Sequence, residues 1–385
     1  MTSPVRATRE QFLAFRLAGH QLTARRPLGE LADVAAACGI RNTPPGSSLL
    51  ALHARVAGLT PAAVDAALAE TKTLVEVLAM RISPHLVPAR DLALFTLGAL
   101  PSDEASLRGV LTTFAAQLDR AGLSASDALE LATEAALAEL ADGPLARGAL
   151  SAGLTRRLTE SLSLFCRACG STHVFESLFR LVGVGGTWVI TRSGKQAVYV
   201  RTDRWLGSAP GGDPPALRLE LLRRYLRCFG PSTARDFGDW AGIGSAEAQR
   251  GWDRVADRLV EVSVDGRRAW ICADDLSAFE SPPEPFGVRF LPPYDAYLDQ
   301  RDRLTLVPDK AQHRQVWATL GNPGGLLLDG ELVGTWRPQK KGKRLAIAVS
   351  AFGPLPPRAR AEIGAEAALL GPVRDCTAVE VTFDA

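Results

Sequence analysis

Two cysteines and a histidine in the middle of the chain have a spacing that suits metal binding. Cys166 and Cys169 are separated by two residues, and His173 follows shortly afterwards. Thiolate and imidazole are the usual zinc ligands, but a structural zinc site needs four ligands, and no second Cys-x-x-Cys or His pair completes this set. We therefore expect no metal and no cofactor. The alternative to a metal site is that Cys166 is buried beside Phe165 and that the residues after it form a turn.

A second group of residues has the chemistry to bind phosphate. The chain has six lysines, and three of them fall with two arginines on one predicted hairpin. Such a cluster is typical of a prong that contacts the DNA backbone or enters the minor groove. The alternative is a solvated edge hairpin whose lysines protect it from aggregation. The cluster consists of Arg337, Lys340, Lys341, Lys343 and Arg344.

Arginines in the N-terminal half add to this basic surface. We expect Arg25, Arg26, Arg55 and Arg81 to line a basic concavity. The net charge of +2 does not itself point to a polyanion, so the expectation depends on where the charges cluster. The partner that this clustering predicts is double-stranded DNA.

Length and composition indicate the broad class of protein. A chain of 385 residues exceeds the roughly 250 to 300 that one core organises, so we expect several domains. The stretch from Met1 to Gln11 is polar and charged, and no apolar run approaches the roughly 20 residues that span a bilayer. Six scattered cysteines do not form a disulfide framework. We therefore expect a cytoplasmic monomer that does not bind membranes.

The elements that must position these residues are clearest between residues 216 and 272, which predict a winged helix-turn-helix. Leucines and aromatic residues from Leu217 to Phe229 form one apolar stripe on an arginine-rich helix, which Gly230-Pro231 ends. A second helix through Trp240 and a third from Ser245 to about Val260 follow. Alternating valines, an Asp265-Gly266 turn and a return strand to Cys272 then predict the wing.

The same theme occurs twice earlier in the chain. Arg25-Arg26-Pro27 and Gly143-Pro144 also begin helices that end near glycine. The middle copy has a helix before it, Ala125 to Leu140, and a hairpin after it, Trp188 to Val200. The first copy lacks a recognisable wing, because the chain is expected to stay helical through Leu78 and again from Ala89 to Leu100.

From Ser281 the composition shifts to proline-rich chain and then to strands. Hairpins are predicted about Asp329-Gly330 and about Lys340 to Lys343, a helix over Pro356 to Leu370, and a closing strand over Ala378 to Phe383. The predicted fold is therefore mostly α with small β hairpins, tandem winged helix-turn-helix units and a C-terminal β domain. The expected domains are 1–115, 116–207, 208–280 and 281–385.

Five stretches in this order resemble the AlkZ-like (YcaQ-like) winged-helix DNA glycosylases. The resemblance covers nearly the whole chain and implies three tandem winged-helix units, a C-terminal β domain and glycosylase action on alkylated bases. No single stretch is diagnostic, and the signal lies in their order. They are LALHARVAGL at Leu50–Leu59, KTLVEVLAMRISPHLVPARDL at Lys72–Leu92, RRYLRCFGPSTARDFGDWAG at Arg223–Gly242, LPPYDAYLDQRDR at Leu291–Arg303 and LLLDGELVGTW at Leu326–Trp336.

The catalytic signature of that family is altered in this chain. Members typically carry Gly-Leu-Gln-x-Gln or a Gln-x-Asp version, whereas this segment reads Gly39-Ile40-Arg41-Asn42-Thr43, with both glutamine positions changed. Hydrolysis of an alkylated purine nucleotide needs a placed water and stabilisation of an oxocarbenium-like transition state. The resemblance thus implies that the oxygens of Asn42 and Thr43 position the water. A guanidinium about 4 Å from the developing cation would be unfavourable by roughly 1 to 4 kcal/mol, so Arg41 is assigned to a phosphate.

Two alternatives stay open from the sequence. The segment from Gly39 to Ser47 also matches a helix end, a Pro-Pro-Gly turn and the next helix cap, with no catalytic role. Loss of both glutamines then makes a non-catalytic winged-helix DNA-binding protein the main alternative function. His20, His53 and His85 are further candidates, but isolated histidines are more often hydrogen-bonded core or surface residues.

Overall fold

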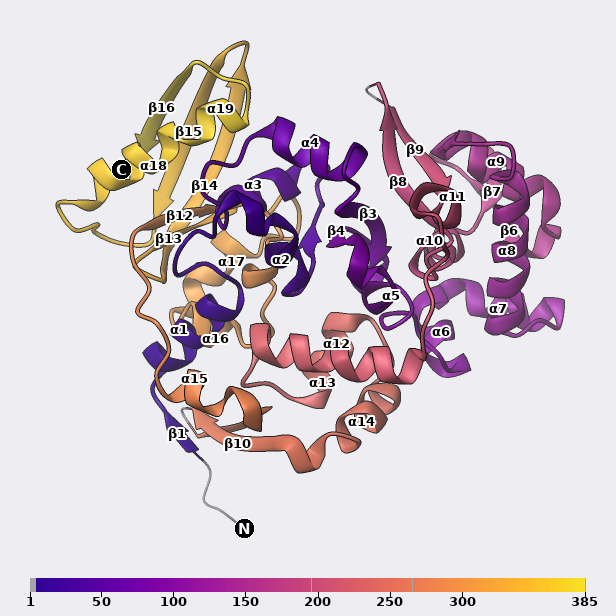
Figure 1. The fold of residues 1–385 in the computed structure, drawn as a ribbon, viewed down its shortest axis with the longest axis horizontal. Coiled ribbons are helices and arrows are strands. Elements are labelled where there is room, and N and C mark those ends of the chain that lie inside the picture. The colour runs from indigo at the N-terminus through magenta and orange to yellow at the C-terminus, as the bar shows by residue number, and fades with distance from the viewer. Residues whose placement is uncertain (1–4, 195, 265, 385) are drawn as a thin grey trace. The chain divides into compact units, whose positions relative to one another are not determined.

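The computed structural model describes residues 5–194, 196–264 and 266–384. It divides the chain into two compact units, each built from segments that are distant in sequence (Figure 1). The first unit comprises Met1–Ala66, Arg224–Ser232 and Arg258–Ala385, and the second comprises Ala67–Arg223 and Thr233–Asp257. No helix within the described residues is both long and apolar enough to cross a membrane.

The first unit contains two sheets. One has the strand order β1-β10-β11, formed by Val5–Ala7, Leu259–Val264 and Arg267–Cys272, with β1 parallel to β10. The other has the order β12-β13-β14-β15-β16 and is antiparallel except for the parallel pair β15 and β16. Its strands are Val288–Leu291, Gly324–Leu328, Glu331–Lys341, Arg344–Ala351 and Ala378–Phe383.

Helices of the first unit cover these sheets, and they are mostly short. Two of them, α4 (Pro61–Ala69) and α12 (Pro214–Phe229), contain a boundary between the units. The other helices are α1 (Arg9–Gly19), α2 (Leu31–Ala36), α3 (Ser47–His53), α15 (Leu276–Glu280), α16 (Arg303–Leu306), α17 (His313–Val316), α18 (Ala359–Ala368) and α19 (Leu370–Val373).

The second unit combines a sheet with a helical core. Within the unit the strand order is β4-β3-β8-β9-β5, formed by Ser83–Pro88, Leu74–Ala79, Trp188–Ser193, Gln196–Arg201 and Leu145–Ala146. A separate hairpin joins β6 (Ser163–Cys166) to β7 (Ser171–Val174). The helices are α5 (Leu92–Phe95), α6 (Glu104–Leu111), α7 (Ala115–Ala121), α8 (Ala125–Glu139), α9 (Arg147–Arg157), α10 (Glu176–Val184), α11 (Thr202–Leu206), α13 (Ala234–Ala241) and α14 (Ser245–Asp253).

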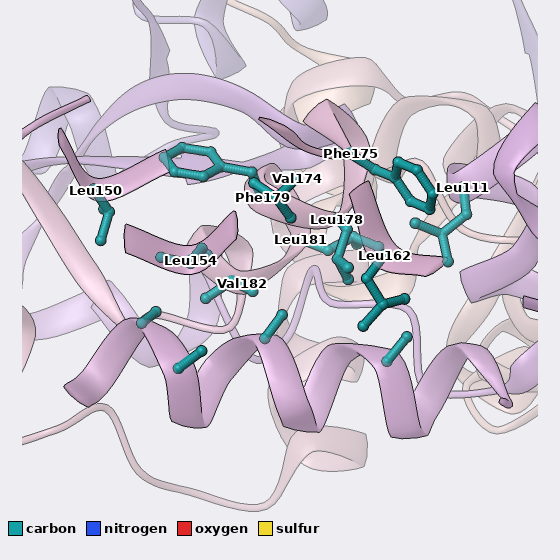
Figure 2. Close-up of a cluster of buried hydrophobic side chains, with 14 of the residues drawn as sticks. Leu111, Leu150, Leu154, Leu162, Val174, Phe175, Leu178, Phe179, Leu181 and Val182 are labelled. Atoms are coloured by element: carbon teal, nitrogen blue, oxygen red, sulfur yellow. The ribbon is translucent and has the colours of Figure 1, made fainter. Parts of the chain in front are cut away.

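Helix α8 shows how the sequence builds this core. A capping box between Ser124 and Asp127 begins the helix, because each side chain accepts a hydrogen bond from the other residue's backbone N–H. Alanines make its buried face, and such small side chains leave room for larger partners. Figure 2 shows those partners, leucine, valine and phenylalanine side chains gathered in one cluster that includes Leu154, Phe175 and Phe179.

Most predicted elements are confirmed. The predicted helix Ala125 to Leu140 is α8, the predicted hairpin Trp188 to Val200 is β8–β9, and the predicted closing strand is β16. Between residues 214 and 272 the expected order of three helices and two strands is present. Its turn residue Asp265 lies outside the described residues, and the packing of these elements as a winged helix stays a prediction.

The expectation of continuous helix through Leu78 is wrong. Leu74–Ala79 and Ser83–Pro88 pair as an antiparallel hairpin, with Val75 opposite Val87. Alternating and β-branched residues in LVEVLA favour a strand, and Pro84 and Pro88 oppose helix. The second predicted stretch, Ala89 to Leu100, is helical only in a short turn and in α5.

Candidate active site

The segment that carries the altered signature links a short strand to a helix in the first unit. β2 comprises Ile40–Arg41, and α3 begins at Ser47 after the turn. Gly39 and Gly46 bracket the segment with φ values of +73° and +88°, which glycine adopts without steric cost. The predicted turn and helix start are therefore present.

Asn42 holds this turn together. Its side chain is 5% exposed, and its Oδ1 accepts hydrogen bonds from the backbone N–H of Gly46 at 2.7 Å and from the Ser48 hydroxyl at 3.0 Å. The N–H of Ser48 is a further donor at 3.4 Å. The Asn42 oxygen is thus engaged by the start of α3 and serves to position the segment.

Thr43 differs from its neighbour in that its hydroxyl is not engaged. The residue is half-buried, and no hydrogen bond joins its side chain to any residue that the structure describes. A hydroxyl can both donate and accept, so it is able to orient a water molecule. Of the two predicted catalytic residues, Thr43 is the one with an available oxygen.

Arg41 has partners within the first unit. Its Nη1 lies 3.3 Å from Oδ2 of Asp299, and its guanidinium carbon lies 5.4 Å from the centre of the Tyr294 ring. Burial lowers the pKa of Arg41 from its ordinary value. Tyr294 has a φ of +60°, an unusual backbone conformation for a tyrosine that tends to occur at functional sites. The sequence assigns Arg41 to a phosphate, whereas here its charge faces a carboxylate.

A buried ion pair in the first unit joins Arg55 to Asp295. Arg55, expected on a DNA-binding surface, is 3% exposed and makes two hydrogen bonds to Asp295, of 2.7 and 2.8 Å. Burial alone would raise the pKa of the Asp295 carboxyl, but the charge and hydrogen bonds of Arg55 prevail and lower it. Arg55 also donates to the carbonyl oxygens of His20 and Ala51. The guanidinium is enclosed by these partners, and a contact of Arg55 with DNA stays a prediction that its burial disfavours.

The three candidate histidines are buried. His20, 1% exposed, packs edge-on against Phe229 and Tyr297, and its Nδ1 lies 3.8 Å from the Cys38 sulfur. His53 is 6% exposed, and burial, with Arg25 and Arg289 nearby, lowers its pKa to about 4. His85 donates from Nδ1 to the Ser83 carbonyl at 2.8 Å. His20 and His85 thus have the contacts of hydrogen-bonded core residues, and His53 is buried beside two arginines.

The other predicted basic residues of the N-terminal half have different environments. Arg25 donates to the His53 carbonyl at 2.8 Å and pairs with Glu366, so it contributes to the packing of the first unit. Arg26 is more accessible, with a side chain 52% exposed and an ion-pair partner, Glu30, four residues later. Arg81 belongs to the second unit, where it lines a hollow and adopts a φ of +52°.

The basic hairpin β14–β15 is confirmed as an element. Its tip turns at Gly342, and the lysine side chains there are exposed. Asp375 partly balances them, because its carboxylate lies 2.5 Å from Lys343 Nζ and 3.8 Å from Lys340 Nζ. Arg337 donates to the Gly321 carbonyl, and Arg344 lies 3.3 Å from Glu380. Lys341 has no ion-pair partner among the residues that the structure describes.

The sequence treats the stretch from Leu291 to Arg303 only as a landmark, and this stretch supplies the neighbours of the candidate site. Tyr294 and Asp299 lie against Arg41, and Asp295 holds Arg55. Their alternation with apolar residues gives no indication of which carboxylate is buried and which reaches Arg41. The concentration of three aspartates in this stretch is the signal that could have drawn attention to it.

Comparisons with known proteins all find similarity to DNA glycosylases. A family model described as DNA glycosylase AlkZ-like matches residues 34–373. The interstrand DNA cross-link repair glycosylase of Streptomyces sahachiroi is 25% identical over 130 residues, which are 32% of this chain and 35% of that protein, so the match spans about a third of the relative's length. The solved structure of Streptomyces sahachiroi DNA glycosylase AlkZ has a TM-score of 0.77 and 20% identity, covering 99% of this chain and 100% of that one. At this identity the structural match shows a shared fold.

Proposed function

The chain belongs to the AlkZ-like DNA glycosylase family, and from this membership we propose that it binds double-stranded DNA and hydrolyses the N-glycosidic bond of alkylated bases. The family match over residues 34–373 carries the proposal, because it includes both the altered signature and the aspartate-rich stretch. We further propose a cytoplasmic monomer that needs no cofactor for this hydrolysis.

Alkylated purines suit this site, because they are leaving groups that need few catalytic side chains. Alkylation at N3 or N7 gives the base a positive charge, so it departs without strong acid assistance. The protein must supply a positioned water and a negative or dipolar group near the developing oxocarbenium ion. In our proposal the Thr43 hydroxyl orients the water, Asn42 holds the turn, and the Asp299 carboxylate supplies the negative charge.

Asp299 also offsets the positive charge of Arg41 in the candidate site. A lone Arg41 would repel the oxocarbenium ion, but the carboxylate 3.3 Å away offsets most of its field at longer range. Arg41 then serves to orient Asp299, and Thr43 follows two residues later in the same segment. This division of roles replaces the two family glutamines with a hydroxyl and a paired carboxylate.

The test is release of base from duplex DNA that carries N7-methylguanine, measured as abasic sites under single-turnover conditions. Thr43→Val, which removes the hydroxyl and keeps the shape, and Asp299→Asn should each lower the rate about tenfold or more while duplex affinity stays within a factor of two or so. Thr43→Ser should retain most of the rate, and Thr60→Val is a control at an exposed threonine. If the wild-type protein releases the base and the Thr43→Val and Asp299→Asn variants release it as fast as the wild type, these roles are refuted.

The relative's name suggests a second substrate for the same experiment. A base in an interstrand cross-link is an alkylated base joined to the opposite strand, so the same bond would be broken. Duplexes with a cross-linked guanine should therefore be unhooked by the native protein and spared by Asp299→Asn. If the protein unhooks the cross-link but does not release N7-methylguanine, its substrates are bulky adducts.

The second candidate function is a non-catalytic DNA-binding protein on the same scaffold. It is favoured by the replacement of both glutamines and by the engagement of the Asn42 oxygen within the protein. Rebuilding the family signature with Arg41→Gln and Thr43→Gln distinguishes the two functions. A native protein without activity that gains a measurable rate on rebuilding would be a binder, whereas a native rate that falls on rebuilding would support the proposed hydrolysis.

A further inference from the structure

The hairpin β6–β7 brings together the cysteines and the histidine whose spacing suits a metal. One donor atom from each of Cys166, Cys169 and His173 lies within 4.8 Å of the others. Among the residues that the structure describes, no other group of histidine, cysteine and acidic side chains converges in this way. We propose that these three side chains bind a zinc ion, through both thiolates and the imidazole.

The turn that carries the cysteines has the geometry of a metal-binding loop. Cys166 ends β6 and Ser171 begins β7, with Cys166 opposite Ser171 in the register. Gly170 closes the turn with a φ of +64°, and its N–H donates to the Cys166 carbonyl at 2.9 Å. The thiolate is the form of cysteine that binds metal.

His173 is oriented as metal-binding histidines are. Its Nδ1 lies 2.9 Å from the carbonyl oxygen of Val174, so Nδ1 carries the hydrogen and donates it. In the neutral imidazole Nε2 then keeps its lone pair and can bind a metal. A backbone carbonyl that fixes the tautomer through the other ring nitrogen is the usual outer support of a zinc-bound histidine.

The base of the hairpin is firmly anchored, whereas its tip is exposed. Val174 and Phe175 are each 1% exposed and belong to the core of the second unit (Figure 2), and β7 packs against α9 (Figure 1). The N–H of Val174 donates to the Thr155 hydroxyl at 3.0 Å. At the tip, Cys169 is exposed and Phe165 is 63% exposed. Cys166 itself is half-buried, so the turn of the alternative interpretation is present but the burial of Cys166 beside Phe165 is not, and core packing does not explain these thiols.

Zinc fits the donor set and the spacing. Two sulfurs bound at about 2.3 Å to a tetrahedral zinc are about 3.8 Å apart, so the three donors need to close by roughly 1 Å or less. Thiolate with imidazole favours zinc over calcium or magnesium, which prefer oxygen. The nearby Glu176 is held by Arg147 and Arg180. Three protein ligands leave the fourth position to water or to an added ligand, and binding releases the protons of both thiols.

The test uses the full-length protein, reduced and kept free of oxygen, with cobalt(II) as a spectroscopic probe for zinc. We expect a single cobalt ion per chain, a thiolate-to-cobalt charge-transfer band and strong visible d–d bands that zinc abolishes. The double variant Cys166→Ser, Cys169→Ser should lose the charge-transfer band, and His173→Ala should lose the intensity of the d–d bands. Cys272→Ser, a half-buried cysteine in β11, is the matched control and should give the parent spectrum.

Two outcomes would overturn the zinc site. One is a charge-transfer band that persists in the double variant. The other is a purified protein with a Cys166–Cys169 disulfide that binds no cobalt after reduction, which would identify a redox-active dithiol instead. Far-ultraviolet circular dichroism of each variant verifies that the fold is retained. Duplex binding and base release are measured in separate experiments. Since Cys166, Cys169 and His173 take no part in the proposed hydrolysis, failure of the zinc site and failure of the hydrolysis can be told apart.

Discussion

At the scale of single residues, His53 is expected to make the stability of the folded protein depend on pH. Its imidazole is buried at the end of α3, and burial together with Arg25 and Arg289 lowers its pKa from 6.5 to about 4. The unfolded chain therefore binds more protons than the folded chain between these two values. The stabilisation from neutral His53 is fully present above about pH 6.5 and is lost as the pH falls towards 4.

We predict that the parent loses up to about 3 kcal/mol more stability than His53→Gln between about pH 7 and pH 4. The glutamine cannot be protonated, so its variant lacks this contribution to the pH dependence. Denaturant unfolding of both proteins at each pH, followed by circular dichroism, gives the difference. Parallel stability curves for parent and variant would show that His53 accepts its proton as readily in the folded state as in the unfolded chain.

Residue type alone could not show which of the predicted basic arginines are exposed and which are buried. Arg26 and Arg55 both belong to the predicted basic concavity, yet Arg26 is exposed and Arg55 is enclosed with Asp295. The partner of Arg55 is 240 residues away in sequence, and no local pattern indicates it. Likewise, the sequence identifies Asn42 as a residue of interest, but only its hydrogen bonds with Gly46 and Ser48 show that its oxygen is engaged.

At the scale of elements, α13 shows how closely two helices of the second unit pack. Thr233 caps the helix, and Gly242 ends it with a φ of +82°. A Cβ added at Gly238 would lie 2.9 Å from the Cβ of Ala248 in α14, so the two helices meet at a position where only glycine fits. Trp240 is 6% exposed and Phe237 is fully buried, so both face the core.

Trp240→Ala should destabilise the second unit by roughly 3 to 5 kcal/mol, because it leaves a cavity that the closely packed helices cannot fill. Thermal unfolding measures the decrease in stability. Arg235→Ala, an exposed position on the same helix, should change stability by less than about 0.5 kcal/mol. If the Trp240 and Arg235 variants melted alike, the tryptophan would not have the packing role assigned to it.

The hairpin β14–β15 leads to a prediction about DNA affinity. Replacing Lys340, Lys341 and Lys343 by Gln should weaken duplex binding and reduce the slope of log K against log salt by about 0.9 for each phosphate that is no longer neutralised. Asp375→Asn should do the opposite, because it releases Lys343 and Lys340 from their acidic partner. Lys310→Gln controls for the removal of a surface charge elsewhere. Equal salt slopes for the parent and the triple variant would exclude the hairpin from DNA binding.

Elements with strong local signals were predictable, and those that depend on tertiary pairing were not. Helix α8 has its capping box and the hairpin β13–β14 its Asp-Gly turn, and both patterns are local. The strand β3 lies between β4 and β8, and periodicity alone does not distinguish its near-continuous apolar sequence from a buried helix, although its valines favour a strand. Its partner β8 begins more than a hundred residues later, beyond the reach of periodicity.

At the scale of the whole molecule, the described chain groups into two units built from interleaved segments, and the four consecutive domains that the sequence predicts stay a prediction. The repeats of helix and hairpin along the chain describe local architecture and carry no information about which segments share a core. Phe12 and Phe15 pack in one cluster with Ile271 and Tyr297. That long-range association is a tertiary property, and it decides where each unit begins and ends.

The parallel pairing of Val5 with Val262 has a consequence for how the protein is made. Residues 1–66 emerge from the ribosome first, but their unit also needs the segments 224–232 and 258–385. At about 5 to 20 residues per second, translation from residue 66 to residue 385 lasts roughly 15 to 65 seconds. During that interval Phe12, Phe15 and Leu17 lack the partners from residues 262–332 with which they pack. The apolar face of α1 is therefore accessible to chaperones and proteases until those partners have been made.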